Sequence, residues 1–314
     1  LDKYIMVCDC AIIRFPTLIT MIAFSKVYRK LPIGLELMIS AHDMIIGESF
    51  FVKLLNRILE SVVKKMCLMA NGVAYVTEWY LQKIYPSYSI KHPESKEHFH
   101  GSYSTVELET CNYHEKKWNK EEKPSEIQMI SIGYMDDQRK GQNKIIKALF
   151  CLKKQGLKFR MRFVGDGKML VKYKEMVEQL GLSDCVEFTG AITDRKKIDF
   201  YLEKSHLFLY FSKAEGIPRV MIEAMAAGLP CLSNPVDGIV EILPRDCYFL
   251  SENPEEMSKK ILEMCSDWNN MIQQSSINYQ TAQKFRKDIL NAKRVAFYTK
   301  LYKTVVNEKH DTNI

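Results

Sequence analysis

The fold of this chain is decided by one stretch, residues 214–230, which reads Ala214-Glu215-Gly216-Ile217-Pro218-Arg219-Val220-Met221-Ile222-Glu223-Ala224-Met225-Ala226-Ala227-Gly228-Leu229-Pro230. The apolar run 207–211 just before it is typical of a buried strand. Pro218 suits the first turn of a helix, and Gly228 suits its end. The pattern therefore predicts a strand, a loop that holds Glu215, and a helix that carries Glu223.

The start of this predicted helix has the chemistry of an anion site with carboxylates beside it. The first N–H groups of a helix have no partner within it, and the helix dipole favours a phosphate there. We expect the backbone N–H groups of Ile217, Arg219 and Val220 to face such a group. Carboxylates are good acceptors for hydroxyl groups, so we expect Glu215 to bind a hexose and Glu223 a ribose.

The two glutamates and their spacing resemble the Glu-x7-Glu motif of the retaining, two-domain GT-B glycosyltransferases, in particular glycosyltransferase family 4. Residues 130–250 resemble the donor-binding half of these enzymes in the order and spacing of further blocks. These are Ile132-Gly133, Arg139-Lys140-Gly141, Val164-Gly165-Asp166-Gly167, Val186-Glu187-Phe188-Thr189-Gly190 and Gly238-Ile239-Val240-Glu241. The resemblance implies an α/β fold in which two Rossmann-like parallel-sheet domains face a central cleft.

Short apolar strands alternate with amphipathic helices along the chain, which predicts parallel sheets with ligands at the carboxyl ends of their strands. The expected strands of the second half are 127–132, 159–164, 186–188 and 207–211, and its helices are 142–154, 169–180, 195–204 and 218–227. The first half alternates more loosely, with expected strands 4–8, 36–41 and 73–77 and helices 17–29 and 49–68.

A polar, charged stretch at 114–126 is the expected interdomain linker. We expect an N-terminal, acceptor-side domain over residues 1–118 and a donor-binding domain over 119–284. A helix within 285–314 would, by the resemblance, cross back to the first domain. Family members usually begin with a strand and a glycine-rich loop, whereas this chain starts in what resembles a mid-domain strand, so we expect the N-terminal domain to be incomplete.

Length and composition fit this organisation. The chain has 314 residues, 46% of them hydrophobic, which is enough for two cores. Its nine cysteines are scattered singly, so a disulfide framework is not expected, and Cys8 and Cys10 are expected to pack in a core. His92, His98 and His100 fall in a polar stretch, 87–101, that predicts a solvated loop rather than a metal site.

The net charge of +7 fits polyanionic ligands or an anionic membrane surface. Basic and aromatic residues do not interleave along one stripe, which argues against a nucleic-acid partner. The N-terminal apolar stretch 11–24 is shorter than the ~20 residues that span a bilayer, so we expect a soluble or peripheral protein. Helix 49–68, with its four basic residues, is a candidate for contact with anionic lipid, although a solvated face is the commoner meaning of this pattern.

A diphosphate leaving group needs cations nearby. The resemblance implies that Lys140 binds the diphosphate. Relatives carry an arginine where this chain has Tyr134, and Arg139 or Arg219 is the candidate to take its place. The resemblance also places loops against the nucleotide, and their residues are Gly133, Gly165, Gly167, Gly190, Ile192 and Gly216.

The N-terminal half contributes one candidate, His42, at the end of the predicted strand 36–41. A lone histidine is usually structural, but this position resembles that of the histidine which family members place near the transferred sugar. By the resemblance, His42, Lys140 and Glu215 form the catalytic set. The implied mechanism is a front-face displacement in which the departing phosphate accepts the proton of the acceptor.

Together these features predict a retaining, metal-independent glycosyltransferase that moves a hexose from a nucleotide-diphosphate sugar to a glycan or lipid-linked acceptor in surface polysaccharide synthesis. The donor is a substrate, and no cofactor is expected. The expected location is the cytoplasm, with peripheral contact at the inner face of the plasma membrane. Two alternatives stay open, a nucleotide-sugar epimerase of the same fold and a non-catalytic donor-binding subunit. The sugar, the acceptor and the choice of uridine or guanosine stay open too.

Overall fold

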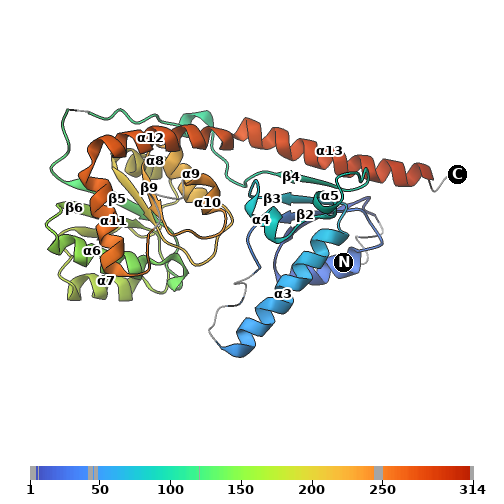
Figure 1. The fold of residues 1–314 in the computed structure, drawn as a ribbon, viewed down its shortest axis with the longest axis horizontal. Helices are drawn as coiled ribbons and strands as arrows, with labels where there is room; N and C mark the ends of the chain where they lie inside the picture. Colours follow the sequence, from blue (N-terminus) through green and yellow to red (C-terminus); the bar gives the residue numbers. More distant parts are fainter. Residues whose placement is uncertain are drawn as a thin grey trace. The chain divides into compact units, whose positions relative to one another are not determined.

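The chain is described here by a computed structural model that covers residues 5, 7–41, 45, 49–119, 121–243 and 250–311. It divides into two compact units (Figure 1). Unit 1 comprises Leu1–Thr105, Ala214–Ile217 and Lys287–Ile314, and unit 2 comprises Val106–Lys213 and Pro218–Arg286. The chain thus passes from unit 1 to unit 2 earlier than the predicted boundary at 118/119, and the short segment Ala214–Ile217 groups with unit 1.

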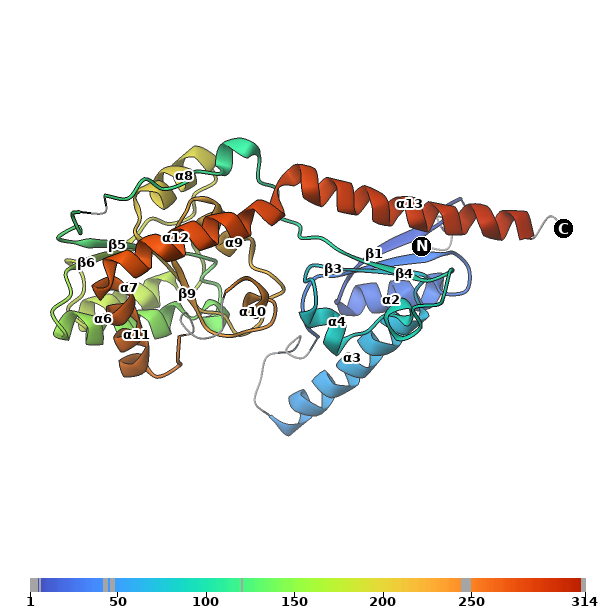
Figure 2. The same ribbon diagram turned by 45° about the horizontal axis from the view of Figure 1, so that its top comes forward.

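Unit 1 contains a parallel sheet in which strands that follow one another in the chain are neighbours, in the order β1-β2-β3-β4. The strands are β1 (Ala11–Phe15), β2 (Ile33–Leu37), β3 (Gly72–Tyr75) and β4 (Phe99–Ser102), and the connecting helices are α2 (Leu18–Val27), α3 (Phe50–Met69), α4 (Tyr80–Ile84) and α5 (Tyr88–Lys91). Because parallel crossovers are right-handed, a sheet built in one direction places all its connecting helices on one face. Figure 2 shows α2, α3 and α4 on this shared face.

The opposite face of this sheet is covered by α13 (Lys287–Asp311), as Figures 1 and 2 both show. Phe297 is buried under the helix and packs edge-on against Phe99, with 5.1 Å between ring centroids. Gly34 and Gly101 leave room for this ring, since a Cβ at either position would meet it at 3.2–3.4 Å. The last long helix is therefore part of the core of unit 1.

A buried carboxylate joins α13 to the sheet. The Glu36 side chain, on β2, accepts hydrogen bonds from the hydroxyl groups of Tyr103 and Tyr298, both at 2.8 Å, and from Nε of Arg14, also at 2.8 Å. Burial alone would raise the pKa of this carboxyl, but the three donors outweigh burial and hold the pKa below its ordinary value. Glu36 is thus ionised inside the sheet and satisfied by three donors.

Unit 2 contains a five-stranded parallel sheet in the order β7-β6-β5-β8-β9. Its strands are β5 (Ile127–Ile132), β6 (Phe159–Val164), β7 (Val186–Phe188), β8 (Leu207–Tyr210) and β9 (Cys231–Ser233). Its helices are α6 (Gln142–Lys154), α7 (Leu170–Gln179), α8 (Arg195–Lys204), α9 (Arg219–Ala226), α10 (Ile239–Ile242), α11 (Pro254–Ser266) and α12 (Trp268–Ala282), with short 3₁₀ turns η1 (Thr110–Asn112), η2 (Gln138–Lys140) and η3 (Gln283–Phe285). Two parallel sheets with crossover helices confirm the predicted α/β architecture.

The stretch that the sequence predicts to be a linker is anchored on unit 2 in its middle part. Trp118 donates from Nε1 to the Ser275 hydroxyl at 2.6 Å and packs edge-on against Trp268, with 4.8 Å between centroids. The Lys116 ammonium donates to the backbone carbonyl oxygens of Glu203 and Ser205. Aromatic and hydrogen-bonding anchors thus fix a segment whose charged composition suggested a free connection.

Several predicted elements of unit 1 are wrong or shifted. Of the strand expected at 4–8, the described residues Ile5, Val7 and Cys8 are not in a strand, and β1 begins at Ala11. Cys8 is exposed and Cys10 is only half-buried, so neither packs in the core as expected. The expected loop 87–101 holds α5 and the start of β4.

Candidate functional site

The order of the unit 2 strands reverses between β5 and β8, which are neighbours in the sheet. Crossovers on the two sides of this point run in opposite directions, so α6 and α7 lie on one face and α8 and α9 on the other. Ligands of open parallel sheets bind at the carboxyl ends of the strands at such a switch point. The loops after β5 and β8 are therefore the first place to look for a site.

Lys140 lies at this switch point. It follows β5 in the short turn η2, and its ammonium group donates to the Tyr210 hydroxyl at the end of β8, at 2.9 Å. The same ammonium lies 5.5 Å from the centre of the Tyr210 ring. Tyr210, from one side of the switch point, thus holds the ammonium group of Lys140, from the other side, at the edge of the sheet. A diphosphate bound there would need such a cation. Tyr210 is a site residue that the sequence did not single out, since it ends an apolar strand.

The two loops are also joined through their backbones. The Lys213 N–H donates to the Arg139 carbonyl oxygen at 2.9 Å. Gly141 turns the chain into α6 with φ +59°, and a Cβ there would come within 2.7 Å of the Phe211 ring. The Lys-Gly step is therefore required by packing between the loops as well as by any ligand.

Arg139 is committed to a neighbour. Its guanidinium pairs with Asp137 at 2.8 Å, and its side chain is mostly exposed. Burial would raise the pKa of the Asp137 carboxyl, but hydrogen bonds from the Arg139 backbone and side chain hold the pKa below its ordinary value. A phosphate that used Arg139 would compete with this ionised carboxylate, so Lys140 is the better placed of the two cations.

The glycines at the ends of β5, β6 and β7 meet one another. Gly165 donates from its N–H to the Gly190 carbonyl oxygen at 2.9 Å, and a Cβ on Gly165, with φ +142°, would lie 2.0 Å from the Gly133 carbonyl oxygen. At Gly167 a Cβ would lie 2.3 Å from the Met135 carbonyl carbon. These glycines thus allow the loops that follow β5, β6 and β7 to pack closely against one another beside the switch point.

Glu223, on α9, is held by a cation that the sequence did not single out. Arg195, the first residue of α8, pairs with the Glu223 carboxylate at 3.1 Å and with Asp199 at 2.8 Å. Asp199 in turn accepts from the Asn112 amide at 3.1 Å. Only 17% of the Glu223 side chain is exposed, so the pair with Arg195 is partly shielded from water. The sequence offered one signal for Arg195, because the basic run 195–197 follows directly after the loop that holds half-buried Ile192.

The start of α9 follows Pro218, which makes no side-chain cap. The first hydrogen bonds of the helix run from the N–H groups of Met221 and Ile222 to the Pro218 carbonyl oxygen, at 3.1 and 3.3 Å. The N–H groups of Arg219 and Val220 lie ahead of these bonds, as the general geometry of a helix start requires. The Arg219 side chain is exposed and Val220 is half-buried.

The remaining predicted residues fall in unit 1 or outside the described residues. Glu215 is half-buried, and Gly216 and Ile217 are buried, in the segment that groups with unit 1. His42 lies outside the described residues. The structure thus brings Lys140, Tyr210 and the glycine loops together within unit 2, and it divides the two glutamates of the motif between the units.

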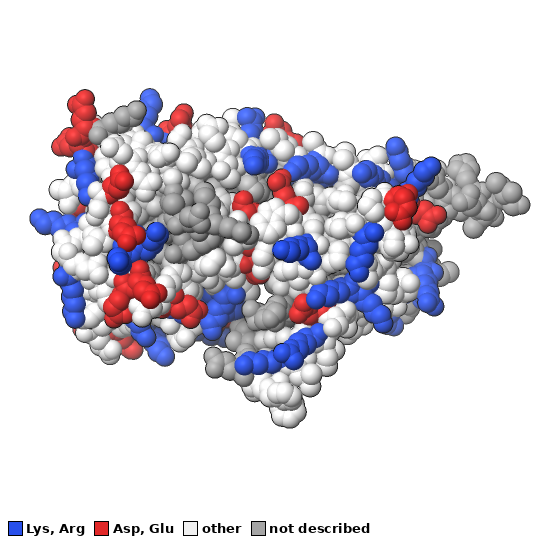
Figure 3. Space-filling model, in the orientation of Figure 1, with Lys and Arg blue, Asp and Glu red and all other residues white. Residues whose placement is uncertain are grey.

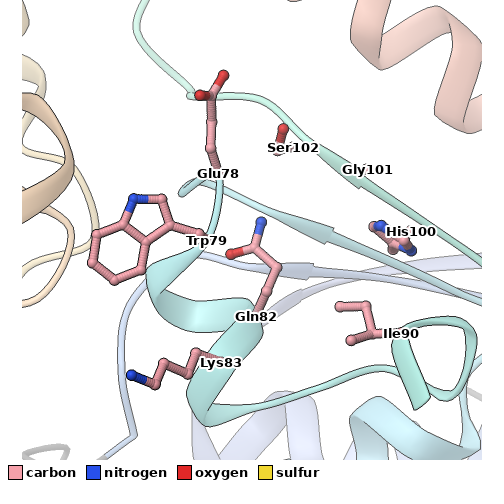
Figure 4. A pocket seen from close by; sticks show the side chains of 8 residues that line it. All are labelled: Glu78, Trp79, Gln82, Lys83, Ile90, His100, Gly101 and Ser102. Carbon is pink, nitrogen blue, oxygen red and sulfur yellow. The ribbon is translucent and has the colours of Figure 1, made fainter.

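Unit 1 has a recess of its own between β4 and the segment that follows β3, with a volume of about 550 Å³. It is lined by Glu78, Trp79, Gln82, Lys83, Ile90, His100, Gly101 and Ser102 (Figure 4). An exposed indole beside a carboxylate, an amide and an ammonium group offers both a flat apolar surface and hydrogen-bonding partners. Such a lining suits a polar ring that carries hydroxyl groups, and the sequence had not pointed to it.

Two general features bear on the chemistry. Among the residues that the structure describes, no three His, Cys, Asp or Glu side chains gather in a way that could hold a metal ion. In the same residues, no helix is both long enough and apolar enough to cross a bilayer.

Comparison with known proteins identifies what this architecture is similar to. The family model described as "Glycosyl transferases group 1" matches residues 112–283, just over half of the chain. Protein CapJ of Staphylococcus aureus is 27% identical over 256 residues, which are 81% of this chain and 62% of that protein. The putative colanic acid biosynthesis glycosyltransferase WcaL of Escherichia coli is 32% identical over 126 residues, 38% of this chain and 30% of that protein. The chain therefore spans less than two thirds of the length of these relatives.

Solved structures share the fold at low sequence identity. Alr3699/HepE of Anabaena, in complex with UDP and glucose, superimposes with a TM-score of 0.68 at 18% identity and covers 95% of this chain and 80% of its own. Sucrose-phosphate synthase from Thermosynechococcus elongatus gives a TM-score of 0.72 at 15% identity, over 96% of this chain and 76% of its own. These matches confirm the GT-B fold for the two units.

Proposed function

The chain belongs to the glycosyl transferases group 1 family, and from that premise we propose that it transfers a hexose, with retention of configuration, from a nucleotide-diphosphate sugar to a glycan or lipid-linked acceptor. The observation that carries the proposal is the ammonium group of Lys140, held at the switch point by Tyr210. A cation fixed at this edge of the sheet would neutralise the charge that develops on a departing diphosphate. A lysine ammonium can supply this charge without a metal ion, and we propose a metal-independent reaction.

The relatives support the substrate class. HepE was solved with UDP and glucose, and WcaL is named as a putative colanic acid biosynthesis glycosyltransferase. We propose a nucleotide-sugar donor and a role in polysaccharide synthesis at the inner face of the plasma membrane for this chain too. Its recess beside Trp79, with hydrogen-bonding side chains around an indole, is our candidate for holding part of the acceptor.

Roles for the other residues follow from their surroundings. Arg195 pairs with the Glu223 carboxylate and so holds it in place, and a carboxylate can accept hydrogen bonds from both hydroxyls of a ribose. The glycine-lined loops that include Gly133, Gly165 and Gly190 would border the nucleotide. Glu215 is proposed to bind the hexose, and His42 to lie near it.

The test of the proposal is diphosphate binding by Lys140→Ala, with Lys154→Ala as the matched control. Lys154 is the last residue of α6, the helix that begins just after Lys140, and its ammonium lies 4.1 Å from the Phe150 ring centre. Loss of one charge-assisted contact should weaken UDP or GDP binding by about 10- to 100-fold in Lys140→Ala. Lys154→Ala should bind as the unaltered chain does.

Product analysis then distinguishes the rival activities. Incubation with the donor alone and with donor plus acceptor separates a transferase, which makes product only with acceptor, from an epimerase, which converts the donor without it. Tight diphosphate binding with no turnover in either mixture would favour a donor-binding subunit. Equal diphosphate affinity in both lysine variants would remove the assignment of Lys140.

A further inference from the structure

The outer surface of α3 carries large apolar side chains that a helix on the surface of a soluble domain normally lacks. Phe50 is 73% exposed and Phe51 79% exposed, and the exposed fraction falls to 37% at Val62. The exposed apolar residues of this helix are Phe50, Phe51, Leu54, Leu55, Ile58 and Val62. Scattered exposed apolar residues are ordinary, but a continuous strip of this length on one helix is not.

The spacing puts these residues on one side of the helix. Phe51, Leu55, Ile58 and Val62 follow one another at intervals of three and four residues, which place side chains above one another on a helix. The inner face is occupied separately, by buried Leu59, Val63, Met66 and Cys67 packed in unit 1. The outer strip is therefore surplus to what folding of unit 1 needs.

The exposure is greatest at the start of α3, where Phe50 and Phe51 pack edge-on with 6.1 Å between ring centroids. Figure 1 shows that this end of the helix projects away from the strands of unit 1. Aromatic side chains at a projecting helix end can insert into an apolar environment outside the protein without any rearrangement of unit 1. We call this strip, Phe50 to Val62, the apolar strip of α3.

Basic side chains accompany the apolar strip. Within residues 50–69 the basic residues are Lys53, Arg57, Lys64 and Lys65 and the single acidic residue is Glu60, which pairs with Lys64 at 2.7 Å. Figure 3 shows uncharged atoms at the end of α3 that is lowest in the view, with Lys and Arg side chains beside them. The helix thus combines an apolar side with an excess of positive charge.

The neighbouring helix extends this character. α2 connects β1 to β2 and lies on the same face of the sheet as α3, and its Leu18, Ile19 and Ile22 are exposed. Basic residues follow at Lys26, Arg29 and Lys30. One face of unit 1 therefore presents apolar side chains from two helices with cations next to both.

We propose that this face docks unit 1 onto an anionic lipid bilayer, with the apolar strip of α3 lying in the interface and its basic side chains at the lipid headgroups. A helix with one apolar side and a basic side is the form that lies in the plane of a bilayer surface. A bilayer satisfies both halves of the surface, because the acyl region takes the phenylalanines and acidic headgroups take the ammonium and guanidinium groups. An apolar partner helix would satisfy only the first half.

The proposal rests on the surface of unit 1 and not on any transfer reaction, so it is tested by binding. The whole chain is incubated with vesicles of phosphatidylcholine alone and of phosphatidylcholine with phosphatidylglycerol, and the bound fraction is measured by sedimentation. We expect binding to the anionic vesicles and little to the neutral ones. Added salt should weaken the binding without abolishing it, because the apolar contribution is not screened.

Three variants divide the contributions. Phe50→Ser/Phe51→Ser should lower the partition coefficient by roughly 10-fold or more, since two exposed aromatic side chains are lost. Lys53→Gln/Arg57→Gln should lower it by roughly 10-fold at low salt and by less at high salt. The matched control is Val171→Ser/Phe200→Ser, which removes two exposed apolar side chains from unit 2 and should leave binding unchanged.

Clear outcomes would overturn the proposal. Absence of binding to anionic vesicles would do so, as would equal binding by the phenylalanine variant and the unaltered chain. An equal loss of vesicle binding in the control variant would show that the binding is not specific to α3. Concentration-dependent self-association that disappears in the phenylalanine variant, without vesicle binding, would assign the strip to a second copy of the chain. If the double variant fails to fold by circular dichroism, Ile58→Ser decides in its place.

Discussion

The two sheets are built from the same kind of parallel crossover, yet they place their helices differently. In unit 1 the strand order follows the chain, so one face receives all the connecting helices and the other is covered by α13 from the far end of the described chain. In unit 2 the order reverses at β5 and β8, and crossover helices cover both faces. Strand order therefore decides which sheet closes on its own and which needs a distant segment.

The charged groups follow the same division. Unit 1 buries the Glu36 carboxylate within its sheet, where two tyrosines and an arginine satisfy it and α13 is held. Unit 2 keeps Lys140 at the edge of its sheet, half-buried and in contact with Tyr210. A charge inside a sheet stabilises the fold, whereas a charge at a switch point is available to a ligand. Variants confined to one unit should therefore affect that unit and leave the other unchanged.

The largest effect is expected where the Gly165 backbone contacts the Gly133 backbone in unit 2. Gly165→Ala would place a Cβ 2.0 Å from the Gly133 carbonyl oxygen and should destabilise unit 2 by more than about 3 kcal/mol. The control is Gly156→Ala, which also has positive φ but meets nothing within 4 Å and should cost about 1 kcal/mol. Urea unfolding followed by Trp118 and Trp268 fluorescence, in a Trp79→Phe background, reports on unit 2. A similar loss in the free energy of unfolding for the two variants would mean that the loops do not depend on the close contact between Gly165 and Gly133.

A somewhat smaller effect is expected in unit 1. Glu36→Ala removes the acceptor of three hydrogen bonds and should destabilise unit 1 by about 3 kcal/mol, because it leaves Tyr103, Tyr298 and Arg14 without this partner. Tyr298→Phe removes one donor and should cost about 1 kcal/mol. Hydrogen exchange should show faster opening of β1–β4 and α13 and unchanged protection of β5–β9. Equal loss of protection in both units would mean that Glu36 stabilises more than unit 1.

The next effect concerns the nucleotide. Glu223→Gln removes the charge that Arg195 neutralises and a strong acceptor for ribose, so UDP affinity should fall by about 10-fold. Asp199→Asn changes the other partner of Arg195 and should alter affinity much less. Calorimetric titration of both variants provides the measurement. Unchanged affinity in Glu223→Gln would place the ribose elsewhere.

The smallest effect is a pH dependence within unit 2. Nδ1 of His206 accepts the Gln128 N–H at 3.1 Å, and burial, with a further contribution from Lys116, lowers the pKa of His206 to about 4 from 6.5. The unfolded chain therefore takes up the proton first as pH falls, and stability that is present above pH 6.5 is lost progressively between pH 6.5 and about 4. His206→Gln should flatten this slope in unit 2 unfolding, while His100→Gln in unit 1 should leave it. A slope that survives in His206→Gln would assign it to another group.

The sequence predicts unit 2 better than unit 1 for physical reasons. β5, α6 and β6 occupy the predicted residues, because each strand is a short apolar run and the loops between them are polar or contain glycine. In unit 1 the strand β1 was missed, because its residues continue into the apolar helix α2. Arg14, a charged residue within that apolar stretch, lies opposite Glu36 in the parallel register and pairs with it.

The candidate site shows the same limit. Lys140 and Glu223 were predicted from local motifs and from the resemblance. Their partners Tyr210 and Arg195 were not, because each contact joins separate loops or helices distant in the chain. A pattern within one stretch can indicate which group meets a ligand. It cannot indicate which group holds that side chain in place.

The covering of unit 1 by α13 has a consequence for the newborn chain. A ribosome releases β1 to β4 first, then all of unit 2, and only afterwards the helix that carries Phe297. Until then the sheet face around Gly34 and Gly101 lacks the ring that packs on it. Unit 2, whose strands and helices lie together in the chain, can complete its fold during synthesis. The part made first is therefore finished last, and its open apolar face is the one that nascent-chain chaperones would need to shield.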